Sequence, residues 1–336
     1  MIQNANPSQP ARPFVSVVVP VLNERPSLEA LCQRMTVALA GAKYAFEIIF
    51  VDDGSTDGSS ETIRGLARSD PRVRYVRLRA NFGKSAALAA GIRVARGTVV
   101  ATIDADLQER PEEIALLLEK LAEGYDVVSG WRVRRGDSRL RHGASALYNV
   151  VLGRLTGVTL HDFNCGFKCY RRAVFEEISV YGGRHRYLPV LAWARGFRVA
   201  EVAVAHGPRL HGRSRYGPGR IVDGAFGILA AAMAARFANN SGSFLATLAL
   251  ATLAAGIGMF VAPILILSPG PRWDAAIVTL AILFAACAVM IVVALAADLT
   301  SSSAPREPEY AIAETSDDLI TPSAAQESRV QDGFSR

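Results

Sequence analysis

Five apolar runs alternate with helical segments between residues 14 and 132. The runs are rich in Val and Ile, and they cover residues 14–22, 46–53, 73–79, 98–106 and 125–132. The segments between them carry apolar residues at helical spacing, over residues 27–40, 59–70, 84–96 and 111–124. Apolar strands that alternate with helices are typical of a parallel sheet covered on both faces. We therefore expect an α/β fold with a mostly parallel sheet.

Polar side chains follow each predicted strand, at the ends that meet along one edge of a parallel sheet. In chain order they are Glu24, Asp52, Asp53, Lys84, Asp104, Asp106, Gln108 and Arg132. Ligands of such sheets bind beyond the carboxyl ends of the strands. A single acidic pair would be typical of a turn or a helix cap, but carboxylates gathered along one edge repel each other. This pattern favours a ligand site that includes a cation.

The Asp-x-Asp-x-Gln run at 104–108 offers hard oxygen ligands, which suit Mg²⁺ or Mn²⁺ bound to a diphosphate. Neither GxGxxG nor GxxxxGK[ST] follows the first strand, which argues against a dinucleotide-dependent dehydrogenase and a P-loop NTPase. The four cysteines are scattered, so neither a disulfide framework nor a structural zinc site is expected. The sequence indicates carboxylate chemistry with a divalent metal and a nucleotide.

Two apolar runs without a charged residue follow, at 244–267 and 275–297. Each is longer than the ~20 residues that cross a hydrocarbon core. A pair of buried core helices is the alternative, although two such runs almost side by side are rare in soluble domains. Arginines precede the first run, whereas the turn at 268–274 holds only Arg272. This asymmetry predicts two transmembrane helices within 244–298, with both ends of the hairpin in the cytoplasm.

The remaining segments complete the predicted organisation. Residues 1–13 have no apolar run and are expected to be flexible, with no cleaved signal peptide, while 14–217 form a cytoplasmic domain. Residues 218–240 form a helix that lies along the membrane interface or in the core of the domain. Residues 299–336 are expected to form a disordered acidic tail. The net charge of the chain is +6, and the positive excess lies in the residues before this acidic tail. A basic domain of this kind suits binding to nucleic acid, nucleotides or an anionic membrane.

Seven motifs along the chain carry a family resemblance. They are PVLNE (20–24), VDDGSTD (51–57), NFGKSAAL (81–88), DADLQERPEEI (104–114), SGWR (129–132), FNCGFKCYRR (163–172) and LHGRSRYG (210–217). Together they resemble the inverting family-2 glycosyltransferases, and among these the polyprenyl-phosphate sugar synthases. The resemblance covers about residues 14–300. It implies a nucleotide-diphospho-sugar transferase fold (GT-A, Rossmann-like) for the domain.

The resemblance also implies roles for single residues. The nucleotide-sugar donor is expected to contact Pro20, Leu22, Glu24, Val51, Asp53, Lys84, Asp104 and Ala105. The metal, Mg²⁺ or Mn²⁺, is expected to bind Asp104, Asp106 and Gln108. The acceptor phosphate is expected at Arg141, Arg209 and Arg215, since arginine pairs bidentately with phosphate and keeps its charge. The residues expected to assist catalysis are Arg132, Asp162, Arg209 and Arg215.

Three of these roles have open alternatives. Arg141 stands among other arginines, so a solvated basic face or a contact with lipid phosphates explains it equally well. The family pattern has Lys where this chain has Arg215, which keeps the charge but changes the contact geometry. Asp162 precedes a glycine turn and is also explained as a cap. A strong base is not required, because an acceptor phosphate with a second pKa near ~6 is already largely ionised.

The resemblance implies a membrane-anchored enzyme that moves one sugar from a nucleotide-diphosphate donor to a polyprenyl phosphate, with inversion at the anomeric carbon. Its expected partners are the donor, the lipid, the membrane and other copies of the chain through the transmembrane helices, but not nucleic acid. It is expected in the cytoplasmic (inner) membrane with its domain in the cytoplasm. The alternatives are transfer to a saccharide or another lipid, and a catalytically silent scaffold that binds nucleotide sugars.

Overall fold

The computed structural model describes residues 15–133, 153–154, 156–180, 184–208 and 310–316, with scattered residues between 278 and 292. The predicted segments 1–13, 218–240 and 244–267 lie outside the described residues, and so do most of 275–297 and of the tail. The chain divides into two compact units, residues 1–227 with 308–336, and residues 228–307. Within the described residues, no helix is both long and apolar enough to cross a membrane.

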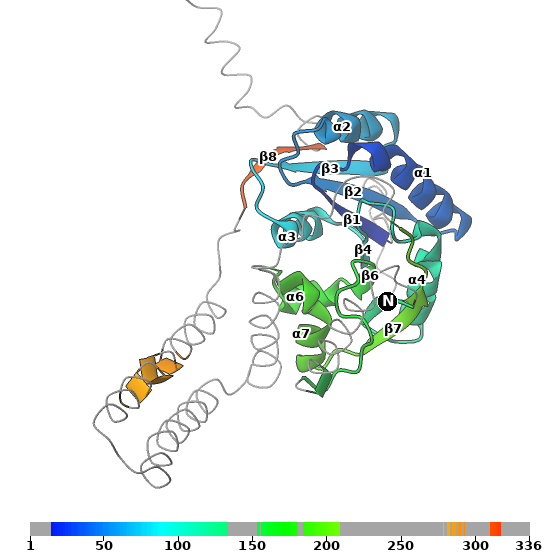
Figure 1. Ribbon diagram of the computed structural model, residues 1–336. Helices are drawn as coiled ribbons and strands as arrows, with labels where there is room; N and C mark the ends of the chain where they lie inside the picture. The colour runs from blue at the N-terminus through cyan, green and yellow to red at the C-terminus, as the bar shows by residue number, and fades with distance from the viewer. Residues whose placement is uncertain are drawn as a thin grey trace, which may run out of the picture. The chain divides into compact units, whose positions relative to one another are not determined.

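The described part of the first unit is built around one sheet, with the strand order β7-β5-β6-β4-β1-β2-β3-β8 (Figure 1). Its strands are β1 (Val15–Val21), β2 (Phe46–Asp52), β3 (Val73–Leu78), β4 (Val99–Thr102), β5 (Val127–Arg132), β6 (Lys168–Arg171), β7 (Val199–Val204) and β8 (Ile312–Thr315). The pairs β1–β2, β1–β4, β2–β3 and β5–β7 are parallel. The predicted α/β fold with a mostly parallel sheet is therefore confirmed.

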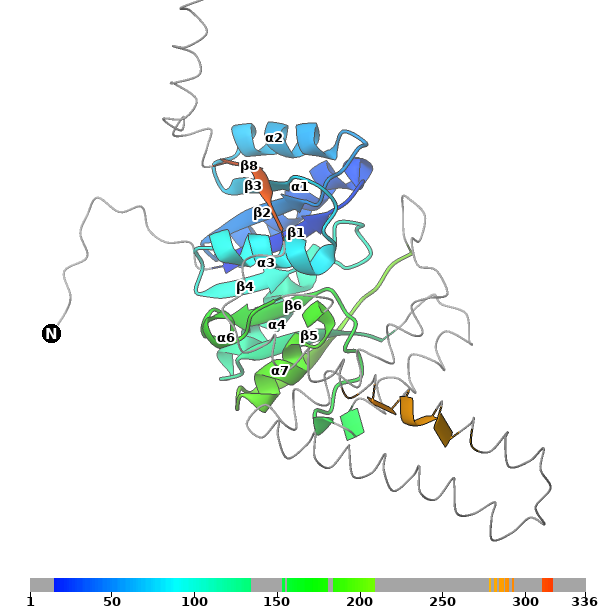
Figure 2. The same cartoon turned by 90° about the vertical axis from the view of Figure 1, so that its left-hand side faces the viewer.

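Helices cover both faces of this sheet, as the predicted alternation requires (Figure 2). One face packs against α1 (Arg25–Gly41), α2 (Ser59–Ser69) and α4 (Ile114–Ala122), which follows the 3₁₀ turn η1 (Pro111–Glu113). The other face packs against α3 (Lys84–Val94), α6 (Ala173–Glu177) and α7 (Leu188–Ala194), which follows η2 (Arg184–Arg186). The two apolar layers hold the strand ends in fixed positions along one edge of the sheet.

Helix α3 approaches the sheet closely because its inner face is made of small residues. A Cβ atom at Gly91 would lie 2.4 Å from Cγ1 of Val18 and 2.9 Å from Cγ2 of Val51. Ala87 and Ala90 on the same helix are fully buried. This tight packing fixes the first residue of α3, Lys84, beside the carboxyl ends of the central strands.

Strand β6 is a feature that the apolar pattern did not reveal. It lies between β4 and β5 and is antiparallel to both, with Lys168 opposite Thr102 and opposite Ser129. Because β6 runs in the opposite direction, its first residues lie where β4 and β5 end. The segment 162–167, which precedes β6, is thereby brought to the same edge of the sheet as Asp104.

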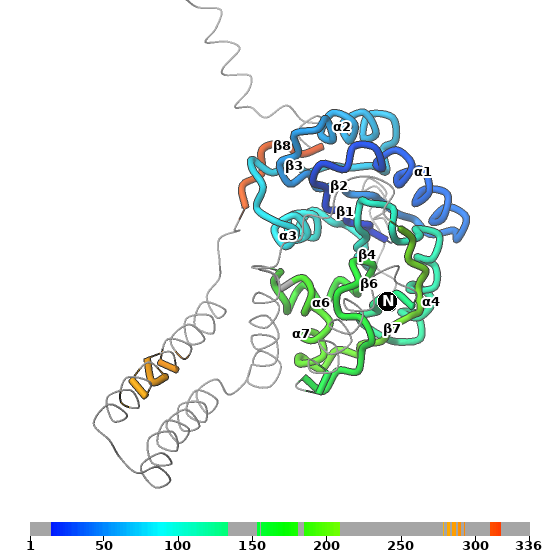
Figure 3. The backbone as a smooth tube through the Cα atoms, in the orientation of Figure 1, coloured from blue at the N-terminus to red at the C-terminus, as the bar shows by residue number. Residues whose placement is uncertain are grey.

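The acidic tail differs from the expectation of disorder over 299–336. Residues Ile312–Thr315 form β8, which pairs antiparallel with β3 at the edge of the sheet, although the two strands are far apart in sequence (Figure 3). Tyr310 and Ile312 pack against the apolar cluster that contains Leu78. Composition did not reveal this strand because it has only four residues, of which Ile312 packs against the apolar cluster.

Candidate active site

The loops after β1 and β2 are joined by hydrogen bonds. The backbone N–H of Asn23 donates to Oγ of Ser55 at 2.9 Å, and the N–H of Thr56 donates to Oδ1 of Asn23 at 2.7 Å. The N–H of Glu24 donates to Oγ of Ser59 at 3.2 Å. The predicted donor residues Leu22, Glu24 and Asp53 therefore lie on two loops that are held together as one unit, and Pro20 and Val51 lie near the ends of the strands β1 and β2 that precede them.

Asp53 connects the second loop to the third. Its Oδ1 accepts the N–H of Phe82 at 2.7 Å, and its Oδ2 accepts the N–H of Gly83 at 2.9 Å. Gly54, which has a positive φ of 76°, lies so close to residues 80 and 81 that a Cβ atom there would approach their backbone to 2.8 Å. Burial raises the pKa of Asp53, against the lowering effect of the two backbone donors. The carboxylate thus organises the start of α3.

Asp104 occupies a closely fitted position after β4. Its Oδ1 forms an ion pair with Nζ of Lys84. On its other side a Cβ atom at Gly166 would lie 2.6 Å from Cγ and from Oδ1 of Asp104. Burial alone would raise the pKa of Asp104, but the nearby charge of Lys84, followed by that of Arg132, holds this pKa below its usual value. The start of α3, the loop after β4 and the segment before β6 therefore meet at this carboxylate.

Asp106 and Gln108 lie in the turn that follows, where Leu107 has a positive φ of 59°. Asp106 is 7% exposed, and its Oδ1 accepts the N–H of Gln108 at 3.2 Å. Nε2 of Gln108 donates to the carbonyl of Gly207 at 3.2 Å, and the N–H of Gly207 donates to the carbonyl of Gln108 at 2.8 Å. Gln108 borders a cavity of about 470 Å³, which is also lined by Arg34, Leu107, Arg110, Glu112, Glu113 and Gly207.

Glu109 is a buried carboxyl group that the sequence reasoning missed. It is 2% exposed, and its Oε2 has no hydrogen-bond partner among the described residues. Burial, followed by the charges of Asp104 and Asp106, raises the pKa of Glu109 to about 8. Its backbone forms an isolated bridge with His206. The acidic character of this edge is therefore greater than the Asp-x-Asp-x-Gln run indicated; Glu109 lies within the DADLQERPEEI motif, but the sequence assigned it no role.

Arg132 and Asp162 form a buried ion pair at the end of β5. Nε of Arg132 lies 2.6 Å from Oδ2 of Asp162, and Nη2 lies 3.1 Å from Oδ1. The N–H of Asn164 donates to the same Oδ1 at 3.1 Å. Asp162 is 1% exposed, so both of its oxygens are directed to neighbouring donors within the protein. This geometry fits a residue that orients Arg132 better than one that faces an acceptor.

The residues preceding this pair form a second contact that the sequence did not suggest. The rings of Trp131 and His161 are stacked, with centroids 4.2 Å apart and an angle of 18° between the planes. Nδ1 of His161 contacts Oε1 of Glu201, and the backbone N–H of His161 donates to Oε2 of Glu201 at 2.8 Å. Trp131 and Arg132 are consecutive on one strand, so the two contacts lie on opposite faces of the sheet.

Of the predicted site residues, the structure brings together Lys84, Asp104, Asp106, Arg132 and Asp162 at one edge. The predicted phosphate ligands Arg141, Arg209 and Arg215 lie outside the described residues. No group of three or more His, Cys, Asp or Glu side chains converges as a metal site in the part of the chain that is described. The described edge thus combines carboxylates with two cations, an arrangement suited to binding a charged ligand.

Comparison of sequences finds similarity to one glycosyltransferase family over most of this domain. Residues 16–179 match the profile of glycosyl transferase family 2. An undecaprenyl-phosphate 4-deoxy-4-formamido-L-arabinose transferase of Pseudomonas aeruginosa is 43% identical over 211 residues, which span 62% of this chain and 62% of the relative. The enzyme of the same name from Aeromonas hydrophila is 42% identical over 205 residues, 61% of this chain and 63% of the relative. The chain therefore spans less than two thirds of these relatives.

Solved structures of other proteins have a fold similar to that of this domain. Glucosyl-3-phosphoglycerate synthase from Mycobacterium tuberculosis, in complex with Mn²⁺ and UDP-glucose, aligns with a TM-score of 0.51 and 23% identity. The alignment covers 66% of this chain and 79% of that one. The likeness supports the GT-A type of fold for the described domain.

Proposed function

We propose, from the match of residues 16–179 to glycosyl transferase family 2, that the chain transfers a sugar to a polyprenyl phosphate. The donor is a nucleotide-diphosphate sugar, and the anomeric carbon is inverted. The observation that carries the proposal is the meeting of Asp104 with the cations Lys84 and Arg132 at the edge where such folds bind ligands. The lipid acceptor is supported by the names of the relatives, which act on undecaprenyl phosphate.

The oxygen atoms at the end of β4 fit a divalent cation. Asp104, Asp106 and Gln108 supply the hard ligands that Mg²⁺ and Mn²⁺ prefer, and Oε2 of Glu109 is buried nearby without a hydrogen-bond partner among the described residues. Because Asp104 is paired with Lys84, we expect Asp106 to be the principal charged ligand, with the diphosphate completing the set. A bound cation would offset the charge of the departing nucleoside diphosphate. Mn²⁺ accompanies UDP-glucose in the mycobacterial synthase.

The side chains at the edge have distinct tasks in this reaction. A phosphate oxygen of the acceptor forms the new bond to the anomeric carbon while the bond to the donor diphosphate breaks. No strong base is needed, since the acceptor phosphate is largely ionised at neutral pH. Arg132, oriented by Asp162, and Lys84, oriented by Asp104, neutralise phosphate charge. Orientation and charge neutralisation then supply most of the acceleration.

The acceptor side of the proposal rests on the sequence. Arg141, Arg209 and Arg215 would bind the lipid phosphate, and residues 244–267 and 275–297 would form the membrane hairpin. The pairing of β8 with β3 supports this arrangement. Residues on both sides of the apolar runs belong to one sheet, so a membrane-spanning segment between them would have to cross an even number of times. The exposed Val278, Ile282 and Val289 on described helical residues suit contact with lipid.

A product assay tests the function. Membranes from cells that express the chain are incubated with a panel of radiolabelled nucleotide sugars, and prenyl-phosphate products are extracted. We expect one donor to label a lipid fraction that releases the sugar in mild acid, and we expect no labelling with an Asp106→Asn variant. Label in a saccharide instead would indicate another acceptor. Binding of a nucleotide sugar without transfer to any acceptor would indicate a scaffold.

A further inference from the structure

Strand β8 forms one edge of the sheet, although its residues follow the two apolar runs in the sequence. Its register places Val76 opposite Thr315 and Arg77 opposite Glu314. The N–H of Arg79 donates to the carbonyl of Ala311 at 2.9 Å, which extends the pairing past the end of β3. Without β8, the outer edge of β3 would present a row of unpaired backbone groups. Residues Ile312–Thr315 are therefore part of the sheet of the domain.

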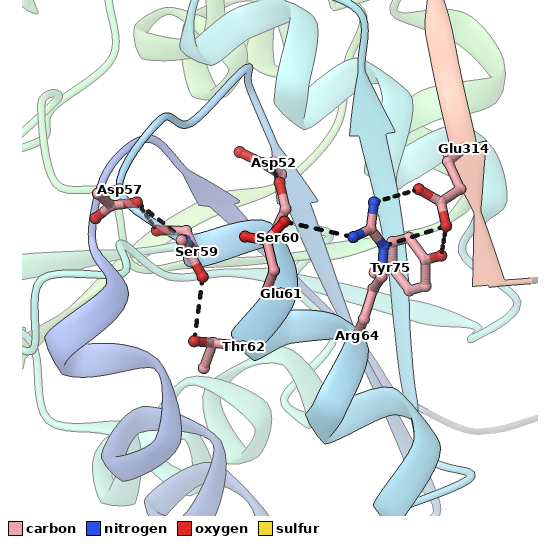
Figure 4. Close-up of polar contacts among 10 residues, drawn as sticks. Asp52, Asp57, Ser59, Ser60, Glu61, Thr62, Arg64, Tyr75 and Glu314 are labelled. Carbon is pink, nitrogen blue, oxygen red and sulfur yellow. Dashed lines mark hydrogen bonds and ion pairs between the residues drawn. The ribbon is translucent and has the colours of Figure 1, made fainter.

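Glu314 makes the main side-chain contacts between β8 and its neighbours (Figure 4). Its Oε2 lies 2.7 Å from Nη2 of Arg64 on α2, and its Oε1 lies 3.2 Å from Nε of the same guanidinium. The hydroxyl of Tyr75 on β3 donates to Oε1. The side chains of Glu314 and Arg64 are only 27% and 24% exposed. One carboxylate thus joins three elements: β8, α2 and β3.

Helix α2 depends on such contacts because its apolar face is small. Ile63 is its one fully buried apolar side chain, and the other buried residues are Ser59 and Ser60. Charge-assisted hydrogen bonds are stronger than neutral ones, so the Arg64–Glu314 pair is a substantial part of what holds the helix on the sheet.

The first turn of α2 is in contact with the donor loops. Oγ of Ser60 donates to Oδ2 of Asp52, the residue before Asp53. Oγ of Ser59 accepts the N–H of Glu24, and Ser59 also binds Asp57. Figure 4 shows the contacts of Ser59 with Asp57 at the start of the helix and those of Arg64 with Glu314 further along it. A shift of α2 would therefore move the loops that carry Glu24 and Asp53.

We infer that Glu314 is a positioning residue for the donor site. Through Arg64 and Tyr75, the strand that follows the apolar runs holds α2 in place, and α2 in turn sets the two loops on which the nucleotide sugar is proposed to bind. The inference rests on the proposed function for the identity of the ligand. The mechanical link between β8 and α2 rests on the contacts alone.

Steady-state kinetics of the full chain separate positioning from catalysis. Glu314→Ala is expected to raise the KM for the nucleotide sugar about 5-fold, the scale of one partly exposed charge-assisted pair. The kcat and the KM for the lipid acceptor are expected to change by less than about 2-fold. Glu61→Gln is the matched control, because Glu61 lies 3.5 Å from Arg64 on the exposed side and its side chain is 70% exposed. An unchanged KM for the nucleotide sugar overturns the inference. A fall in kcat as large as the rise in this KM overturns it as well.

Hydrogen exchange of the full chain without any ligand distinguishes a failure here from a failure of the proposed function. We expect faster amide exchange over residues 59–66 in Glu314→Ala, and unchanged exchange in Glu61→Gln. Unchanged exchange in Glu314→Ala overturns the link whatever the reaction is. If Glu314→Ala does not fold, Arg64→Lys keeps the charge but loses the two-pronged geometry, and the same two measurements apply with a smaller expected effect.

Discussion

The ammonium group of Lys84 contacts the carboxylate of Asp104, across the gap between the start of α3 and the end of β4. This pair shows how the fold serves a charged ligand, since a cation and a carboxylate from separate elements meet at the edge where ligands bind in such sheets. The close packing of α3 through Gly91 fixes one partner, and the backbone of Gly166 supports the other. The pair also explains how several carboxylates are held together at one edge.

The close approach of Gly166 to Asp104 gives the first prediction. Gly166→Ala would place a Cβ atom 2.6 Å from Cγ of Asp104, so the carboxylate must move away from Lys84. We expect turnover to fall at least about 10-fold, because a small displacement of a positioned group lowers the rate strongly. Gly65→Ala is the control, since nothing lies within 4 Å of a Cβ atom there. Normal turnover in Gly166→Ala would contradict this role for Asp104.

The pair Arg132–Asp162 gives the second prediction. If Asp162 orients Arg132, Asp162→Asn should lower kcat about 10-fold or more without changing the shape of the pH profile of kcat. If Asp162 removed a proton instead, the acidic limb of the profile would disappear in the variant. Arg132→Lys should reproduce the loss, because lysine cannot bind both carboxylate oxygens in the same planar manner. A profile that loses its acidic limb refutes the positioning role.

The ion pair of Glu314 gives a pH-dependent prediction. The hydrogen bond with Arg64, acting against burial, lowers the pKa of Glu314 from its ordinary 4.5 in the folded protein. The folded state therefore releases this proton more readily than the unfolded state, and the stabilisation is present above pH 4.5 and lost as the pH falls further. The unfolding free energies of the wild type and Glu314→Gln should differ by about 1 kcal/mol near neutral pH and converge in acid. Denaturant titrations at several pH values measure this, and a constant difference would count against it.

The membrane hairpin gives the fourth prediction. A cysteine introduced at Gly270 in the predicted turn should react with an impermeant thiol reagent applied to intact cells. A cysteine at Ala313, the exposed residue of β8, should react only after the cells are opened. The physical reason is that β8 pairs with β3, so this strand must lie on the same side of the membrane as the domain. Labelling of residue 313 in intact cells would contradict the cytoplasmic placement of the domain.

Much of the fold could be predicted from the sequence because buried strands and amphipathic helices have distinct spacings of apolar residues. The five predicted strands and the four helices between them are present. The four-residue strands β6 and β8 could not be predicted, since their place depends on partners distant in sequence. For the same reason the ion pair of Asp104 with Lys84 was not foreseen.

The residue types of the candidate site and their place in the sheet could be predicted from the sequence. Their interaction partners could be predicted less well. Asp104, Asp106 and Arg132 lie at the expected edge, because the end of a parallel strand fixes the position of the next few residues. The burial of Glu109 and the engagement of Asp162 by Arg132 depend on how loops pack, and no local pattern encodes them. Gly166 is an example, since a Cβ atom at this position would collide with Asp104, which lies far from it in the sequence.

The central claim is sugar transfer to a prenyl phosphate, and one measurement with the purified full chain in detergent tests it. The donor identified by the membrane assay is offered with Mn²⁺ and either undecaprenyl phosphate or undecaprenol, and the products are analysed by mass spectrometry. We predict a prenyl monophospho-sugar from the phosphate alone, reduced at least about 100-fold by chelation of the metal or by Asp106→Asn. Equal transfer to undecaprenol, or undiminished transfer after chelation, would contradict the account.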